Sequence, residues 1–182
     1  MEEISDTLTM KRWWRFRTQP SLWSSFLQAM SCSRKHHVAR KNYANTSHEW
    51  KNLMRINKKA KPNMIWKLQA ATCSFWWDNW IEKGSLTNLC HNVRTPAKTP
   101  VKNFIQNNQW NIDNLQRIVP THMVQQILKI EIGPSSQPDF TIWNLSHNRH
   151  YSNNSAWQIN RNKRQTLMEA ITPIRAMLEW VV

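Results

Sequence analysis

The sequence predicts an α+β fold made mostly of short α-helices, with one or two small antiparallel β-hairpins and poorly ordered ends. Three observations support this prediction. Short stretches carry apolar residues at helical spacing, a few others are typical of strands, and segments rich in Pro, Asn and Ser separate them. A length of 182 residues suits a single domain, and twelve tryptophans supply a large apolar volume for its core.

Two helices are predicted in the first third of the chain. Pro20 and Ser21 open the first of them. Its apolar face comprises Leu22, Trp23, Phe26, Leu27 and Met30. Thr46 and Glu49 fit a capping box that begins the second helix, which should end before Pro62. The apolar residues of this second helix are Trp50, Leu53 and Met54.

The strand predictions rest on aromatic and alternating stretches. Residues 64–68 are short and apolar, and residues 74–81 are rich in aromatics, which favours a half-buried pleated surface. We expect these two stretches to pair as a hairpin, with residues 69–73 as the turn. Residues 139–145 alternate as a further strand does, and a polar turn follows over residues 144–151.

Short helices are predicted in the second half of the chain. The first three have their apolar residues within 101–105, 112–119 and 120–128, and Pro120 stands where the third would begin. Ser152 is a candidate cap for another helix. Its inner residues would be Ala156, Trp157 and Ile159.

These elements divide the chain into four segments. We expect a flexible N-terminus over residues 1–10 and a basic, tryptophan-rich connector module over residues 11–94. A Pro/Thr/Lys linker over residues 95–100 leads to a helical segment with a strand over residues 101–160. A divergent tail follows over residues 161–182.

The formal net charge of +14 is concentrated in the first part of the chain. Residues 1–67 hold 14 Lys and Arg against 4 Asp and Glu, which is a charge of +10. Such an excess is typical of a protein that binds nucleic acid. The alternative is a solvated basic surface with no selected partner.

Three clusters of cations are the candidate nucleic-acid contacts. Because Arg and Lys neutralise phosphates, we expect these side chains to bind the backbone of RNA or DNA. The clusters comprise Lys11, Arg12, Arg15 and Arg17, then Arg34, Lys35, Arg40 and Lys41, and finally Lys58, Lys59 and Lys61.

Aromatic residues interleave with the first cluster. Trp13, Trp14 and Phe16 have two possible roles: stacking on bases, or filling a core behind the cations. Of these two we favour the core. The same reasoning predicts core positions for Trp50, Trp66, Trp143 and Trp157.

The carboxylates give no sign of an enzyme. Nucleotide polymerisation requires clustered carboxylates that hold two metal ions, and no two aspartates are adjacent in this chain. The aspartates are scattered: Asp6, Asp78, Asp113 and Asp139. For Asp78, which lies among tryptophans, we favour a hydrogen-bonded turn over a catalytic role.

Cysteine and histidine spacing predicts neither a metal site nor a cofactor. The cysteines are Cys32, Cys73 and Cys90, and no C-x-x-C pair occurs. Their odd number and wide spacing predict reduced thiols in an intracellular protein, in the nucleus or the cytoplasm. No signal peptide and no transmembrane stretch are visible.

An ordered series of short motifs runs from Arg12 to Ile159. The motifs are W-W-R-F, S-L-W-S-S-F, S-H-E-W, I-W-K-L, S-F-W-W-D-N-W, Q-W-N-I, I-V-P, D-F-T-I-W and Y-S-N-N-S-A-W. In this order they resemble the polyprotein of plant LINE-type (non-LTR) retrotransposons. The similar region lies between the reverse-transcriptase core and the reverse-transcriptase zinc-binding domain.

The resemblance implies a parent protein that makes DNA on an RNA template, and a connector region that holds nucleic acid. This chain departs from the family where the family has glycine turns. Residues 69–72 read Q-A-A-T, Asn108 precedes Gln-Trp, and residues 147–150 read H-N-R-H. Asparagine tolerates positive φ, so we expect some of these turns to survive. Residues 161–182 do not resemble the family, as a truncation or frameshift in a decayed element would explain.

We therefore expect a truncated, non-catalytic segment that binds RNA or DNA weakly and without sequence specificity. It should have no membrane partner, and exposed tryptophans should favour self-association. Two alternatives stay open. One is a decayed pseudogene product without selected function. The other is a small protein-interaction scaffold, in which a helix over 172–181 docks on a partner.

Overall fold

The computed structural model describes residues 2–32, 47–90, 98–159 and 161. Within these ranges, helices and two small antiparallel sheets confirm the predicted α+β class. The helix predicted over residues 172–181 and the order of the C-terminal end lie outside the described residues. No helix of the described ranges combines the length and the apolar composition needed to cross a lipid bilayer.

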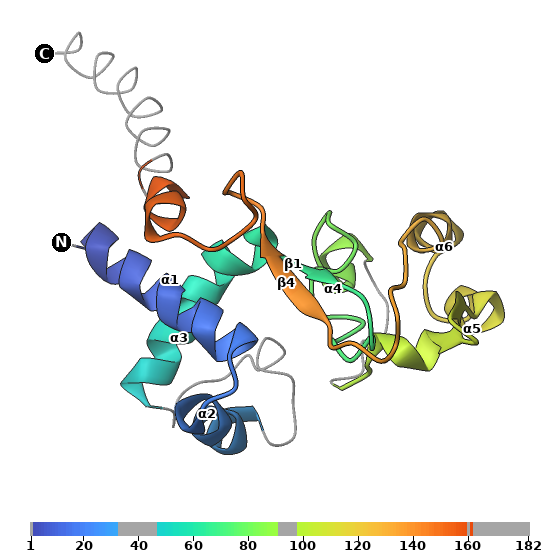
Figure 1. Ribbon diagram of the computed structural model, residues 1–182, viewed down its shortest axis with the longest axis horizontal. Coiled ribbons are helices and arrows are strands. Elements are labelled where there is room, and N and C mark those ends of the chain that lie inside the picture. Colours follow the sequence, from blue (N-terminus) through green and yellow to red (C-terminus); the bar gives the residue numbers. More distant parts are fainter. Residues whose placement is uncertain (1, 33–46, 91–97, 160, 162–182) are drawn as a thin grey trace, which may run out of the picture.

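Three helices form the first part of the fold: α1 (Glu2–Thr18), α2 (Leu22–Cys32) and α3 (His48–Ala60). Helix α1 packs along α3, and α2 follows α1 after a short turn (Figure 1). The Ser47 side chain caps α3 by accepting a hydrogen bond from the backbone N–H of Trp50 at 3.2 Å. The cap is therefore Ser47, one residue after the predicted Thr46, which lies outside the described residues.

The N-terminal residues are helical, which corrects the expectation of a flexible segment over residues 1–10. Asp6 anchors them, because its carboxylate is buried and contacts Arg55 at 2.5 Å and Lys59 at 2.6 Å. Met10 is fully buried one turn further along α1. An ion-paired carboxylate and a core methionine thus attach this segment to α3.

Strands β1 (Met64–Lys67) and β4 (Phe140–Trp143) form an antiparallel pair in which Met64 lies opposite Trp143. The predicted hairpin between residues 64–68 and 74–81 is therefore wrong. Residues 74–81 form turns, and nearly all of their side chains are buried, whereas a half-exposed strand would alternate.

A carboxylate at the start of β4 explains why the pairing is long-range. Asp139 accepts hydrogen bonds from the backbone N–H groups of Gln69, Ala71, Thr72 and Cys73, at 2.6 to 2.9 Å. Ala71 has a φ of 51°, a left-handed conformation that turns the chain around this carboxylate. The segment after β1 consequently wraps around Asp139, and β4 becomes the partner strand.

The second sheet is a hairpin of β2 (Ile105–Gln106) and β3 (Gln109–Trp110). Its two-residue turn has positive φ at both Asn107 (52°) and Asn108 (59°), as a type I′ turn requires. Asparagine thus adopts the positive φ values of this turn without glycine.

Short helical segments complete the described chain. They are η1 (Lys61–Asn63), α4 (Leu86–Leu89), η2 (Val101–Phe104), α5 (Ile112–Gln116) and α6 (Thr121–Ile127). Residues 153–159 are helical as well, and Ser152 accepts a hydrogen bond from the backbone N–H of Ser155 at 3.2 Å. The predicted cap at Ser152 is thus confirmed, as is the start of α6 after Pro120.

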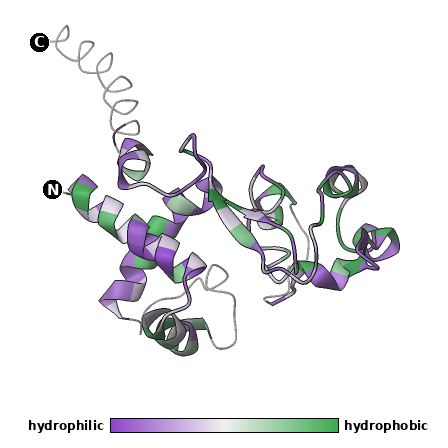
Figure 2. Cartoon of the chain, viewed as in Figure 1, coloured by the Kyte–Doolittle hydropathy of each residue, from purple (hydrophilic) through white to green (hydrophobic). Residues whose placement is uncertain are grey.

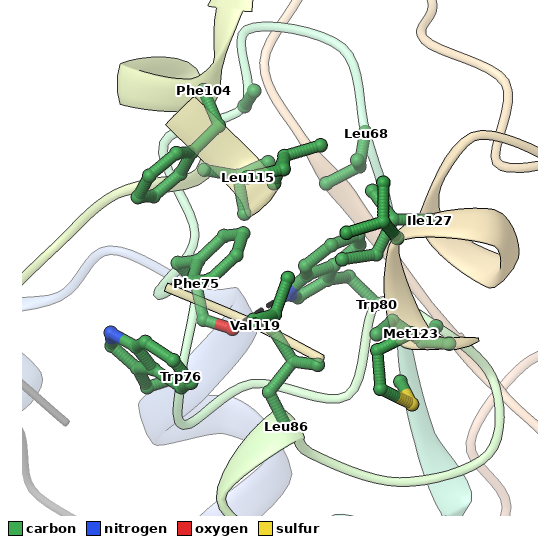
Figure 3. Packing of buried hydrophobic residues seen from close by; sticks show 14 of the residues in the cluster. Leu68, Phe75, Trp76, Trp80, Leu86, Phe104, Leu115, Val119, Met123 and Ile127 are labelled. Carbon is green, nitrogen blue, oxygen red and sulfur yellow. Dashed lines mark hydrogen bonds between the residues drawn. The ribbon is translucent and has the colours of Figure 1, made fainter. Parts of the chain in front are cut away.

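The buried residues form two cores, which we name by the elements around them. The helical core lies between α1, α2 and α3 and contains Met10, Trp13, Phe16, Leu27, Trp50, Leu53, Met54, Ile56, Ala60, Met64, Trp143 and Ala156. The loop core lies among residues 68–90, η2, α5 and α6, and Figure 3 shows it around Phe75, Trp80 and Leu115. In it the indole N–H of Trp80 donates to the carbonyl oxygen of Phe75 at 2.9 Å.

The tryptophans of the described chain are mainly structural. Trp13, Trp50 and Trp143 are at most 1 % exposed, and Phe16 is buried beside them, which confirms their predicted core positions. Trp66 is partly buried and packs against both cores. Trp157 is a correction: it is only partly buried and lies outside both cores, with the Arg161 guanidinium 5.3 Å above its ring.

Candidate functional site

Helix α1 distributes its four cations over different faces, because each residue turns the helix by about 100°. Arg12 and Arg15 are three residues apart, lie on the same face and are both exposed. Lys11 is half-buried beside them. Figure 2 shows the resulting mixture of polar and apolar residues along α1.

Arg17 faces inward and is a correction to the candidate contacts. Its side chain is 8 % exposed, and its guanidinium donates to the Asp78 carboxylate at 2.8 Å. The guanidinium also lies over the rings of Trp13 at 5.9 Å and Trp66 at 5.1 Å. Arg17 therefore serves the fold, and we remove it from the nucleic-acid contacts.

Asp78 has the structural role predicted for it. One carboxylate oxygen accepts from Arg17, and the other accepts from the backbone N–H of Ser74 at 2.8 Å. The backbone N–H of Asp78 in turn donates to the carbonyl oxygen of Ser74. This closed turn leaves no carboxylate oxygen of Asp78 without a partner.

The cations at the end of α3 also fall into two groups, one on the surface and one with partners inside the fold. Lys58 is exposed, whereas the Lys59 ammonium contacts Asp6 at 2.6 Å. The Lys61 ammonium donates to the hydroxyl of buried Ser85 at 3.2 Å, and burial lowers the pKa of Lys61 to about 8. Lys59 and Lys61 therefore have internal partners, and Lys58 is the surface cation of this cluster.

The second predicted cluster cannot be placed. Arg34, Lys35, Arg40 and Lys41 lie outside the described residues. The candidate contacts that the structure places on the surface are thus Lys11, Arg12, Arg15 and Lys58.

An open groove of about 570 Å³ brings part of the predicted site together. We call it the α1–α2 groove, and it is lined by Arg12, Arg15, Gln19, Ser21, Trp23 and Glu49. Arg12 lies 3.2 Å from Glu49, and their side chains are 59 % and 33 % exposed. An ion pair this exposed contributes about 0–1 kcal/mol and exchanges readily for another anion.

Arg15 makes fewer polar contacts than Arg12. Within the described ranges, no hydrogen bond or ion pair of its guanidinium is found. With Arg12 and Arg15 against Glu49, the groove carries an excess of one positive charge. Its charge suits an anionic ligand.

Trp23 is the functional candidate that the sequence analysis missed. It was assigned to the apolar inner face of α2, but it is 38 % exposed and lines the groove. The buried face of α2 instead holds Ser24 and Leu27. Ser24 is buried because its hydroxyl donates to backbone carbonyls near the start of α2 and accepts from the backbone N–H of Ser21 at 2.9 Å. The reciprocal hydrogen bonds between Ser21 and Ser24 at the start of α2 were the signal that Ser24, and not Trp23, lies on the buried face.

The described residues contain no group of three or more His, Cys, Asp or Glu placed to hold a metal ion. Three of the four aspartates are engaged in the structural contacts described above. Burial raises the pKa of both the Cys73 and Cys90 thiols, which keeps them in the unreactive protonated form.

Comparisons with known proteins were negative: no family model, no curated protein and no solved structure matches this chain.

Proposed function

We propose that this chain is a non-catalytic, sequence-nonspecific nucleic-acid-binding segment related to the connector region of plant LINE-type reverse transcriptases. The α1–α2 groove is the observation that carries the binding proposal. It presents Arg12 and Arg15 on one face, beside an exposed aromatic ring, in the most basic part of the chain. The relationship to reverse transcriptases is supported by the ordered motifs of the sequence.

The contact set proposed within the described residues leaves out Arg17, Lys59 and Lys61, whose side chains have internal partners, while the cluster Arg34, Lys35, Arg40 and Lys41 stays a prediction. The contact set comprises Lys11, Arg12, Arg15 and Lys58, and weak binding to RNA or DNA is expected of it. If these four cations contact phosphates of a single strand, the logarithm of the affinity should fall with the logarithm of salt at a slope of about −3. We further propose an intracellular location, which the buried, reduced thiols of Cys73 and Cys90 support.

A salt titration tests this proposal. A fluorescent single-stranded oligonucleotide is titrated with the full chain, starting at about 50 mM salt, and the double variant R12E/R15E is compared with the wild type. The matched control is R117E/K129E, which makes the same charge change at exposed positions near α5 and α6.

The proposal predicts that R12E/R15E weakens binding at least tenfold and that R117E/K129E has a much smaller effect. Equal losses in the two variants would mean that net charge, and no particular surface, attracts the oligonucleotide. If the wild type does not bind at low salt, the alternative hypothesis of a decayed pseudogene product without selected function is favoured.

A further inference from the structure

Trp23 lines the α1–α2 groove, and its ring would determine whether the groove prefers single-stranded or duplex nucleic acid. We infer that Trp23 stacks on an unpaired base, so that the groove prefers single-stranded RNA or DNA to a duplex. This inference rests on the proposed function, because it assumes that Arg12 and Arg15 hold the backbone.

The geometry places a flat ring and phosphate-binding groups in one concavity. Trp23 lines the same groove as Arg12 and Arg15, and its side chain is the most exposed of the tryptophans in the described ranges. Phe16 holds the ring from inside the fold, in an edge-on contact with centroids 6.1 Å apart and planes at 84°. A ring fixed in this way loses little conformational entropy when a base stacks on it.

The size and the polar lining of the groove fit a nucleotide. Its volume of about 570 Å³ lies within the range of small-ligand sites, about 300–1,000 Å³. Gln19 adds an exposed amide that can pair with a base edge. Glu49 accepts hydrogen bonds only, so its carboxylate suits an amino group on a base and repels phosphate, which leaves the phosphate to Arg12 and Arg15.

Base pairing determines whether a base can stack on the Trp23 ring. In a duplex the faces of the bases are covered by their neighbours, whereas an unpaired base can be splayed out and stacked on an aromatic side chain. Arg12 and Arg15 bind the backbone of either form. The contribution of Trp23 should therefore appear in single-strand binding alone.

The experiment compares three variants of the full chain with the wild type. W23L keeps an apolar side chain against Phe16 but removes the flat ring, and W23F keeps a ring. W157L is the matched control, because Trp157 is also partly exposed but lies outside the groove. Each protein is titrated by fluorescence anisotropy with one single-stranded oligonucleotide and with its duplex, and a thermal melt checks folding.

We expect W23L to weaken single-strand binding by about 5- to 160-fold, the range for loss of one stacked base, and to change duplex binding by less than twofold. W23F and W157L should stay close to the wild type. Unchanged single-strand binding in W23L, or an equal loss on both probes, would overturn the inference.

Two further results separate this inference from the proposed function. If the wild type binds neither probe, the proposed function itself fails. If R12E/R15E weakens binding but W23L does not, the proposed function stands and Trp23 has no part in it. Displacement of the oligonucleotide by a poly-glutamate peptide, equally from the wild type and W23L, would identify the groove as a site for acidic protein segments.

Discussion

The guanidinium of Arg17 donates a hydrogen bond to the carboxylate of Asp78 at 2.8 Å, and their side chains are only 8 % and 6 % exposed. The two residues belong to different parts of the fold, since Arg17 lies in the last turn of α1 beside the helical core and Asp78 lies in the turns around the loop core. Trp66, which packs against both cores, lies under the same guanidinium. This ion pair therefore joins the two cores.

The first prediction concerns the stability of this junction. D78N should lower the free energy of unfolding by about 3–5 kcal/mol, because it removes the negative charge that faces the buried Arg17 guanidinium at 2.8 Å. R12A, which breaks the exposed pair with Glu49, should cost less than about 1 kcal/mol. Urea unfolding at neutral pH measures both. Similar costs for the two variants would show that the Arg17–Asp78 pair is no more important than a surface pair.

The second prediction concerns acid. Burial by itself would raise the pKa of Asp6, but hydrogen bonds from Arg55 and Lys59 outweigh it and hold the pKa below the ordinary value of 3.8. The ionised carboxylate therefore stabilises the fold above about pH 3.8, and this contribution is lost as the pH falls further.

The variant D6N tests this directly. At pH 7 it should be less stable than the wild type by about 1–3 kcal/mol, and the difference should shrink below pH 3.8. Unfolding midpoints measured from pH 7 to pH 2.5 give the comparison. D113N, at an exposed position in α5, serves as the control and should follow the wild type throughout. A D6N deficit that is independent of pH would contradict the ion-pair assignment.

The third prediction concerns alkali. Burial lowers the pKa of Lys61 from 10.5 to about 8, so the unfolded chain binds the Lys61 proton more tightly than the folded chain does. Between pH 8 and pH 10.5 the Lys61 contribution to stability should rise with pH, by at most about 3 kcal/mol.

The variants K61M and K58M separate this effect from other alkaline titrations. Relative to the wild type, K61M should lose stability progressively as the pH is raised from 8 to 10. K58M removes an exposed lysine three residues away and should show no such trend. Chemical unfolding at several alkaline pH values measures the difference, and parallel curves for K61M and the wild type would refute the assignment.

The fourth prediction concerns self-association. Exposed tryptophans were expected to drive it, but Trp23 contributes less exposed apolar surface than the outer face of α2, where Leu22, Phe26 and Met30 are 93 %, 62 % and 68 % exposed. Apolar patches of this kind favour association. F26Q/M30Q should therefore reduce concentration-dependent association in sedimentation velocity.

A control pair of variants keeps this test specific. I112Q/L145Q removes two exposed apolar side chains at the other end of the molecule and near β4, where the exposed fractions are 45 % and 43 %. It should leave association unchanged. Equal effects of F26Q/M30Q and I112Q/L145Q would indicate nonspecific apolar association rather than association through the outer face of α2.

The elements that the sequence predicted well are those with local causes. The start of α6 at Pro120 and the cap at Ser152 depend on residues within one turn of the helix. The asparagine turn between β2 and β3 depends on two adjacent residues. Such features can be read from a short window because their hydrogen bonds close within it.

The features that escaped prediction depend on distant partners. Asp139 accepts hydrogen bonds from the backbone N–H groups of Gln69, Ala71, Thr72 and Cys73 across almost seventy positions, and no local pattern signals that contact. Arg15 and Arg17 are two residues apart with the same chemistry, yet one lies in the groove and the other is buried. Which face of α1 meets Asp78 is decided by the packing of both cores.

The pairing of β1 with β4 has a consequence for how the chain is made. The helical core contains Trp143 and Ala156, so helices α1 to α3 emerge from the ribosome before their core can be completed. At about 5–20 residues per second, synthesis of the chain between Met64 and Trp143 takes about 4 to 16 seconds. During that interval Trp13 and Trp50 lack an indole that finally packs in the same core. We therefore expect the apolar side chains of α1 and α3 to stay partly uncovered until Trp143 and Ala156 have been synthesised.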